Sequence, residues 1–247
     1  MDSDLFEKLL KEAIEEREKR APVKSIGLFK NVYEQAKNID QKLMVLNHLG
    51  LAFFHTAWSY EKSDLSKFEE YMICSHGTFN VAYEKASSIA DGLDHRDQEA
   101  IALRNLSRPE FAAYETDGLH TCALFALKAC MLAKECMLKD QVWFTHGRIT
   151  VLIELAKSRG EEISTKEIKR LVRREAAQWF WLTGGEPKLN RQVWLLGLLE
   201  DVAKVYPNLV TYKRLMKMWY YAKKNGLERR AEQLSKFILE LYPQQPA

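Results

Sequence analysis

Arginine, asparagine, histidine and aromatic side chains recur at comparable places in three segments of the chain, and together they could bind a peptide. Arginine holds a carboxylate through two parallel hydrogen bonds, and aromatic rings give apolar anchors a surface to pack on. We therefore expect a binding surface for a protein or peptide partner that carries acidic groups. If the arginines instead only cover helix surface with solvated heads, no such surface exists. The expected peptide-binding residues are Asn47, Phe54, His55, Arg104, Arg108, Phe111, Phe144 and Arg148.

Histidine and cysteine could also do chemistry, but their spacing argues against it. His48 and His55 lie seven residues apart, His76 lies on the next predicted helix, and the sequence contains no His-Glu-x-x-His motif. Cys74 stands two residues from His76, which on a helix points the two side chains in different directions. Phosphate-binding glycine loops and Gly-x-Ser-x-Gly motifs are also missing from the sequence. We expect a non-enzymatic protein with no metal site and no cofactor, and a metal-dependent or otherwise cryptic enzyme is a third alternative after the two binding functions.

A second set of residues would suit nucleic acid. The C-terminal third combines basic residues with the aromatic segment AAQWFWLTGG (176–185), Trp194 and the run WYY (219–221). Bases can stack on aromatic rings beside a basic track. RNA binding by this third is therefore the alternative function, and a homodimer contact through the same aromatics is a further interpretation. The basic residues nearest to the run are Lys213, Arg214, Lys217, Lys223 and Lys224.

Helices must position these residues, because apolar side chains recur every three or four residues along the chain. Only 11 glycines and 6 prolines interrupt the pattern. N-caps are expected at Asp40, Asp64, Asp140, Ser164 and Asn208, and helix ends at glycines 160, 184–185 and 226. The pattern predicts ten or eleven helices, at about residues 3–24, 25–38, 41–62, 65–91, 96–115, 118–138, 141–160, 165–183, 188–206, 208–225 and 227–242.

An internal repeat relates three of these helices. The segments YEQAKNIDQK (33–42), YEKASSIADGLDHRDQE (83–99) and ALKACMLAKECMLKDQV (126–142) align, and four residues match at a constant offset of 43. The repeat predicts that its aligned alanines occupy equivalent buried sites and that its small residues stand where helices approach closely. The alanines are Ala36, Ala86 and Ala129, and the small residues are Gly50, Ser107 and Gly147.

The stretch Leu46-x-x-Leu49-Gly50-x-x-Phe53, together with YEKASSIA, resembles the tetratricopeptide repeat. Weaker copies begin at Leu103 and Trp143, and the resemblance covers about residues 22–160. It implies an α-solenoid of antiparallel helix pairs, whose first helices line a concave face that binds a peptide or partner helix. The segment 207–234 resembles a single pentatricopeptide repeat, a family that binds RNA.

Composition fits one folded domain over 1–247, with an N-terminal helix (1–21), helix pairs (22–160) and a basic, aromatic-rich part (161–247). Apolar residues make up 47% and charged residues 29%. Residues 1–156 carry a net charge of −5 and residues 157–247 a net charge of +8. No apolar run approaches the roughly 20 residues that span a bilayer, so we expect no membrane contact. Four cysteines without a Cys-x-x-Cys pair suggest reduced thiols and a cytoplasmic scaffold protein.

Overall fold

The computed structural model describes residues 3–19, 22–88, 95–138, 141–160 and 211–244. Every regular element in those residues is a helix, and they contain no strand, so the predicted all-α class is confirmed. Two predicted helices (165–183 and 188–206) lie outside the described residues. The same holds for the predicted caps Asp140, Ser164 and Asn208 and for the glycine pair at 184–185.

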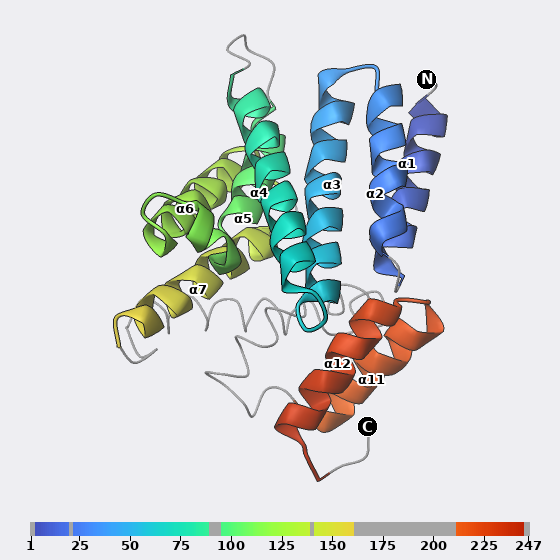
Figure 1. Cartoon of the computed structure of the whole chain (residues 1–247), viewed down its shortest axis with the longest axis vertical. Helices are drawn as coiled ribbons and strands as arrows, with labels where there is room; N and C mark the ends of the chain where they lie inside the picture. Colours follow the sequence, from blue (N-terminus) through green and yellow to red (C-terminus); the bar gives the residue numbers. More distant parts are fainter. Residues whose placement is uncertain (1–2, 20–21, 89–94, 139–140, 161–210, 245–247) are drawn as a thin grey trace. The chain divides into compact units, whose positions relative to one another are not determined.

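The chain divides into two compact units, Met1–Val151 and Leu152–Ala247. In the first unit the α-helices from α1 to α6 pack one after another along the chain, and α1 to α4 run in alternating directions (Figure 1). This is the predicted α-solenoid arrangement of antiparallel helix pairs. Its helices are α1 (Ser3–Glu18), α2 (Pro22–Gln35), α3 (Ile39–Tyr60), α4 (Leu65–Ser87), α5 (Arg96–Leu106), the 3-10 helix η1 (Pro109–Tyr114), α6 (Leu119–Glu135) and α7 (Gln141–Ser158), which extends past the unit boundary.

The second unit contains a helix hairpin formed by α11 (Tyr212–Lys224) and α12 (Glu228–Leu241). Gly226 has φ +68° between the two helices, which confirms the predicted glycine stop. Trp219 donates its indole N–H to Ser235 Oγ at 2.9 Å, so a partly buried polar group joins the two helices. The apolar faces that meet are Leu215, Met218 and Ala222 from α11 and Ala231, Leu234, Phe237 and Ile238 from α12.

Two helix boundaries differ from the prediction for reasons that the sequence contains. The predicted helix 96–115 is interrupted, because the residue before a proline disfavours helical dihedral angles and Arg108, before Pro109, is extended at φ −66°, ψ 132°. The cap of α3 is Asn38, whose side chain accepts from the Gln41 amide at 2.8 Å, and the predicted Asp40 lies in the first turn. Asp64 caps α4 as predicted, accepting from the Lys67 amide at 3.1 Å.

The predicted repeat positions are in the core. Ala36, Ala86 and Ala129 are 6%, 6% and 0% exposed, and Ala36 and Ala129 each belong to an apolar cluster of the first unit. A Cβ added to Gly50 would overlap the ring of Phe79, and one added to Gly147 would overlap the side chain of Arg104. Ser107 is fully buried and donates to the Arg104 carbonyl at 2.8 Å. The predicted close contacts are therefore confirmed at Gly50 and Gly147, and Ser107 is buried as a core residue.

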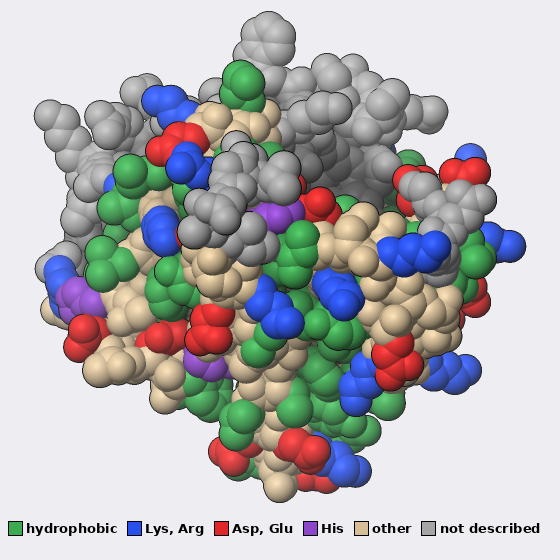
Figure 2. Space-filling model, turned by 90° about the horizontal axis from the view of Figure 1, so that it is seen from above, with side chains coloured by type: hydrophobic (Ala, Val, Ile, Leu, Met, Phe, Trp, Pro, Cys, Tyr) green, Lys and Arg blue, Asp and Glu red, His purple; other side chains and the backbone are tan. Residues whose placement is uncertain are grey.

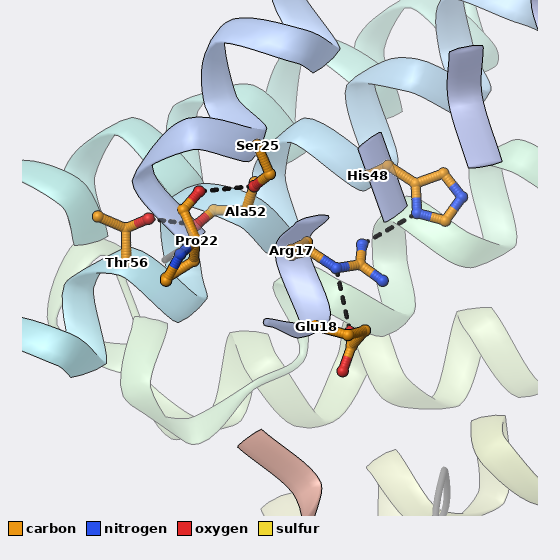
Figure 3. A network of polar contacts seen from close by, with 7 residues as sticks. All are labelled: Arg17, Glu18, Pro22, Ser25, His48, Ala52 and Thr56. Atoms are coloured by element: carbon orange, nitrogen blue, oxygen red, sulfur yellow. Dashed lines mark hydrogen bonds and ion pairs between the residues drawn. The ribbon is translucent and has the colours of Figure 1, made fainter. Parts of the chain in front are cut away.

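A charged cluster is enclosed where α1 meets α3 (Figure 3). Arg17 and Glu18 are 4% and 3% exposed, and Arg17 Nε donates to Glu18 Oε1 at 3.3 Å. Arg17 Nη1 lies 3.1 Å from His48 Nδ1, and the His48 ring stacks on Phe29 with centroids 5.8 Å apart. Because a guanidinium can only donate, Nδ1 must accept, which places the imidazole proton on Nε2. Burial, reinforced by the charge of Arg17, lowers the pKa of His48 to about 3.

Candidate functional site

The expected peptide-binding residues lie on α3, α5 and α7, on η1 and in the turn before it, where they join neighbouring helices. Five of them have almost no exposed surface, and three are partly exposed. The five buried ones are Asn47, Phe54, Arg104, Phe111 and Phe144. The partly exposed ones are His55, Arg108 and Arg148, and their peptide-binding role stays a prediction.

Asn47 and Arg104 each make a hydrogen bond between the first helices of two neighbouring helix pairs, α3 with α5 and α5 with α7. Asn47 Nδ2 on α3 donates to Gln98 Oε1 on α5 at 3.3 Å. Arg104 Nε on α5 donates to the Trp143 carbonyl at 2.9 Å, and its guanidinium lies 5.0 Å from the centre of the Trp143 ring. Arg104 Nη2 also lies 3.2 Å from His146 Nδ1. A peptide carboxylate would have to displace these groups to reach the Arg104 guanidinium. The described contacts of Arg104 therefore connect α5 with α7.

Arg108 and the phenylalanines make the contact between α3 and the turn that leads into η1. The Arg108 guanidinium lies 4.5 Å from the centre of the Phe54 ring, and Nη2 donates to Asn105 Oδ1 at 3.3 Å. Phe54 meets Phe111 edge to face, with centroids 5.8 Å apart. A guanidinium over an aromatic face is attracted to the electrons of the ring, so this contact stabilises the packing of Arg108 on α3.

Trp58 extends this cluster to the surface, and the sequence analysis did not include it. Its side chain is 39% exposed, and its ring meets Phe54 at 6.1 Å and Phe68 at 5.6 Å, both edge to face. Trp58 lies four residues after Phe54 and eleven after Asn47, on the same stripe of α3. The same spacing, applied to the sequence, would have placed Trp58 among the expected binding residues. We refer to Phe54, Trp58, Phe68, Arg108 and Phe111 as the Trp58 cluster.

His76 and Cys122 of the first unit are held in structural contacts. His76 Nε2 lies 2.8 Å from Glu115 Oε1, which ties α4 to the chain after η1. Cys122 is fully buried and donates from Sγ to the Arg108 carbonyl at 3.5 Å. Burial, with smaller contributions from nearby carboxylates, raises the pKa of this thiol to about 12. Across the described residues, no three side chains of histidine, cysteine, aspartate or glutamate gather in a way that could bind a metal ion.

A basic stripe runs along the exposed face of α11. Lys213, Lys217, Tyr220 and Lys224 follow one another at four-, three- and four-residue intervals, so they share one side of the helix. All four are exposed, and Tyr220 is 64% exposed. A rise of about 1.5 Å per residue separates consecutive lysines by roughly 6 and 10 Å along the axis. The aromatic segment 176–185 and Trp194 lie outside the described residues.

The fold and these surfaces define an all-α protein of stacked antiparallel helix pairs. No family model, curated protein sequence or solved structure matches the chain. Among the helices that the structure describes, none has both the length and the apolar character needed to cross a bilayer. Arguments about function therefore depend on the surfaces described above.

Proposed function

We propose that this chain is a non-enzymatic scaffold that binds a peptide or partner helix at the Trp58 cluster. The observation that supports the proposal is the exposure of Trp58 against the buried ring of Phe54, over which Arg108 lies, and the partly buried ring of Phe68. Tryptophan and arginine are the residues most enriched among those that dominate binding energy at protein interfaces. The partner would place an apolar side chain on the Trp58 ring and a carboxylate near the Arg108 guanidinium. This is the acidic, apolar partner expected from the sequence.

The rings packed around Trp58 would favour the free energy of such a contact in two ways. A tryptophan carries up to about 250 Å² of surface, so covering the 39% that Trp58 exposes removes roughly 100 Å² from water. At about 25 cal/mol per Å² this contributes roughly 2 kcal/mol to binding. Because Phe54 and Phe68 already hold the indole, little side-chain entropy remains to be lost when the partner binds.

Affinity capture from an extract of the native host tests the proposal. Tagged wild-type protein, Trp58→Ala and the control Leu65→Ala would be compared by quantitative mass spectrometry. Leu65 is 64% exposed at the start of α4 and belongs to no cluster, so it matches Trp58 as an exposed apolar side chain. We expect proteins that Trp58→Ala loses and Leu65→Ala retains, with all three chains equally helical by circular dichroism. Capture of the same proteins by all three would contradict the proposal.

RNA binding by α11 is a second candidate function, and the basic stripe favours it. Lysines can contact successive phosphates, and one base can stack on the exposed ring of Tyr220. Three phosphate contacts on a single strand predict a logarithmic salt dependence with a slope of about −2. Affinity would then fall about twentyfold between about 50 and 200 mM salt.

Fluorescence anisotropy with a labelled single-stranded RNA of about 20 nucleotides tests this candidate at both salt concentrations. Changing Lys213, Lys217 and Lys224 to Glu should abolish binding, whereas Tyr220→Ala should weaken it by about 5- to 100-fold and leave the salt slope unchanged. Lys236→Glu, on the exposed face of α12, is a control that reverses one charge away from the stripe and should have a small effect, which each single Lys→Glu change in the stripe should exceed. Absence of wild-type binding at the lower salt concentration would exclude the candidate.

A further inference from the structure

The connection between α5 and α6 is longer than an antiparallel helix pair needs. It covers residues 107–118 and contains η1, whereas residues 61–64 suffice to connect α3 with α4. Packed helices are usually joined by about 2–8 residues, and a longer connection often has a function of its own. The helix pair alone does not account for the extra length of this segment, residues 109–117, which we call the strap.

The helix pair α3–α4 encloses one side chain of the strap. Phe111 is 0% exposed and is the only residue of η1 that is buried. Its ring centroid lies 5.8 Å from that of Phe54 on α3 and 6.0 Å from that of Phe79 on α4, both edge to face, and 5.4 Å from that of His76. On the face shown in Figure 2, by contrast, hydrophobic side chains reach the surface among charged ones, as is ordinary for a folded protein. We refer to Phe54, His76 and Phe79 as the socket.

A polar contact holds the strap four residues after Phe111. Glu115 Oε1 lies 2.8 Å from His76 Nε2, and both side chains are mostly buried. Asn80 Nδ2 lies 3.3 Å from His76 Nδ1. Because an amide nitrogen can only donate, Nδ1 accepts, and the imidazole proton is on Nε2, where it is donated to Glu115. The strap therefore presents an aromatic ring and, four residues later, a carboxylate to the socket.

Contacts that do not involve the strap hold α3 against α4 at the socket. A Cβ added to Gly50 of α3 would overlap the ring of Phe79, so the two helices are in close contact there. Ser75 of α4 is fully buried and donates from Oγ to the Gly50 carbonyl at 2.8 Å. The socket should therefore persist when the strap is not seated in it.

The backbone hydrogen bonds of the strap, in contrast, are local. The Phe111 amide donates to the Arg108 carbonyl at 3.0 Å, and the Glu115 amide donates to the Ala112 carbonyl at 3.3 Å. Bonds of this kind are kept when a segment moves as a unit, and a segment with few buried contacts opens more easily than a core helix. Phe111 and Glu115 are therefore the main groups that keep the strap seated.

We infer that the socket is a binding site for short protein segments that carry an aromatic residue and, four residues later, a carboxylate, and that the strap occupies it as an intramolecular ligand. The aromatic ring of such a segment enters between Phe54 and Phe79, and its carboxylate accepts from His76. A short tether holds the strap near the socket at an effective concentration in the millimolar range, so an external segment must displace it. The inference does not rest on the partner proposed for Trp58, because the contacts of Phe111 and Glu115 with the socket do not involve that residue.

A fluorescent peptide with the sequence of residues 108–118, RPEFAAYETDG, tests the inference by anisotropy. The full chain with Phe111→Ala, which empties the socket, should bind it with a dissociation constant on the order of 0.1 mM. The wild type should bind it about tenfold more weakly or worse, because its own strap competes. Binding by the wild type that is as tight as that by the variant would overturn the inference.

Changes in the peptide test which of its groups the socket recognises, and they leave the protein untouched. With the Phe111→Ala chain, a peptide in which Phe111 is replaced by Ala should bind about 30-fold more weakly or not at all. Replacing Glu115 of the peptide by Gln should weaken binding about 3- to 10-fold. A scrambled peptide of the same composition is the control. Equal binding of the scrambled peptide or of the alanine peptide would overturn the inference.

Hydrogen exchange followed by NMR tests the seating of the strap in the wild type, so it decides the question even where Phe111→Ala fails to fold. The hydrogen-bonded amides of Phe111 and Glu115 should exchange through a local opening, at a rate that low urea concentrations do not change. Glu115→Gln should accelerate this exchange about threefold, whereas Glu110→Gln, which changes an exposed carboxylate of the same strap, should leave it unchanged. Exchange of these amides only through global unfolding would show that the strap is a fixed part of the core and would overturn the inference.

Discussion

His48 illustrates how burial decides the chemistry of a single residue in this fold. Its ring accepts from Arg17 and stacks on Phe29, so a second proton would leave two cations in contact in a desolvated cluster. Burial and the charge of Arg17 accordingly lower the pKa of His48 from 6.5 to about 3. At neutral pH the histidine is a neutral packing residue, with no described role in binding.

This pKa predicts an acid-sensitive contribution to stability. Between about pH 3 and pH 6.5 the unfolded chain binds a proton at this residue and the folded chain does not. Unfolding is therefore favoured as the pH falls, by about 1.4 kcal/mol per pH unit. Urea denaturation of the wild type and His48→Gln at pH 7, 6 and 5 should show a steeper loss in the wild type. Parallel losses would show that another group is responsible.

Met137 occupies a backbone position that favours glycine. It has φ +50° just after α6, where the Leu138 amide donates to the Ala133 carbonyl at 2.9 Å and the Met137 amide to the Lys134 carbonyl at 3.2 Å. Gly226 ends α11 with the same pair of hydrogen bonds and φ +68°. The first site therefore carries a strain that the second avoids, and 83% of Met137 is exposed, so its side chain loses little contact if removed.

Exchanging residue types at these two sites should have opposite effects. We expect Met137→Gly to raise the free energy of unfolding by about 0.5–1 kcal/mol, because glycine adopts this conformation without steric cost. Gly226→Ala should lower it by a comparable amount for the converse reason. Thermal denaturation of the two variants and the wild type measures both. A loss of stability in Met137→Gly would mean that the methionine side chain matters more than the backbone strain.

Glycines inside the helices separate into two classes by what surrounds them. At Gly50 and Gly147 an added methyl group would overlap Phe79 and Arg104, respectively. At Gly27 and Gly77 it would meet nothing within 4 Å. The first two therefore permit close packing between helices, whereas the other two only weaken their own helices.

The four Gly→Ala substitutions should consequently differ in sign. Gly27→Ala and Gly77→Ala should stabilise the chain by about 0.5–1 kcal/mol each, through helix propensity. Gly147→Ala should destabilise it by about 2 kcal/mol or more, because Arg104 would be pushed from its buried partners, and Gly50→Ala should cost about 1–3 kcal/mol through overpacking. Chemical denaturation checks all four. Stabilisation by Gly147→Ala would contradict the packed geometry at Arg104.

The helical class was predictable because its signals are local. Apolar spacing gave the helices, and the offset of 43 residues placed Ala86 and Ala129 at equivalent buried sites. Burial of the expected binding residues was not predictable in the same way. A stripe of α3 that faces inward can either line a surface or pack against the next first helix, and its spacing is identical in both cases. The distance to α5 decides between them, and at Asn47 that distance is short enough for a hydrogen bond.

At the scale of the whole first unit, three side-chain contacts connect α3 with α5, α3 with the turn before η1, and α5 with α7. They are Asn47 to Gln98, Phe54 to Arg108 and Arg104 to Trp143, respectively. These contacts between helices are made by polar and aromatic residues that the sequence analysis predicted to bind a peptide. The proposed binding of a partner therefore depends on groups that reach the surface, which are Trp58 in the first unit and the basic stripe of α11 in the second.

Cys122 offers a measure of how cooperatively the first unit holds together. It lies on α6 and packs with Ala126 of the same helix and Val151 of α7. Burial raises the pKa of its thiol to about 12, so it presents almost no reactive thiolate at neutral pH. The other three cysteines are partly exposed. A chromogenic thiol reagent should therefore react with three groups in the native protein and with Cys122 only when the packing of α6 on α7 opens. Gly147→Ala should accelerate the fourth reaction because it loosens α7, whereas Gly77→Ala should slow it. Immediate reaction of all four thiols in the native wild type would contradict the buried position of Cys122.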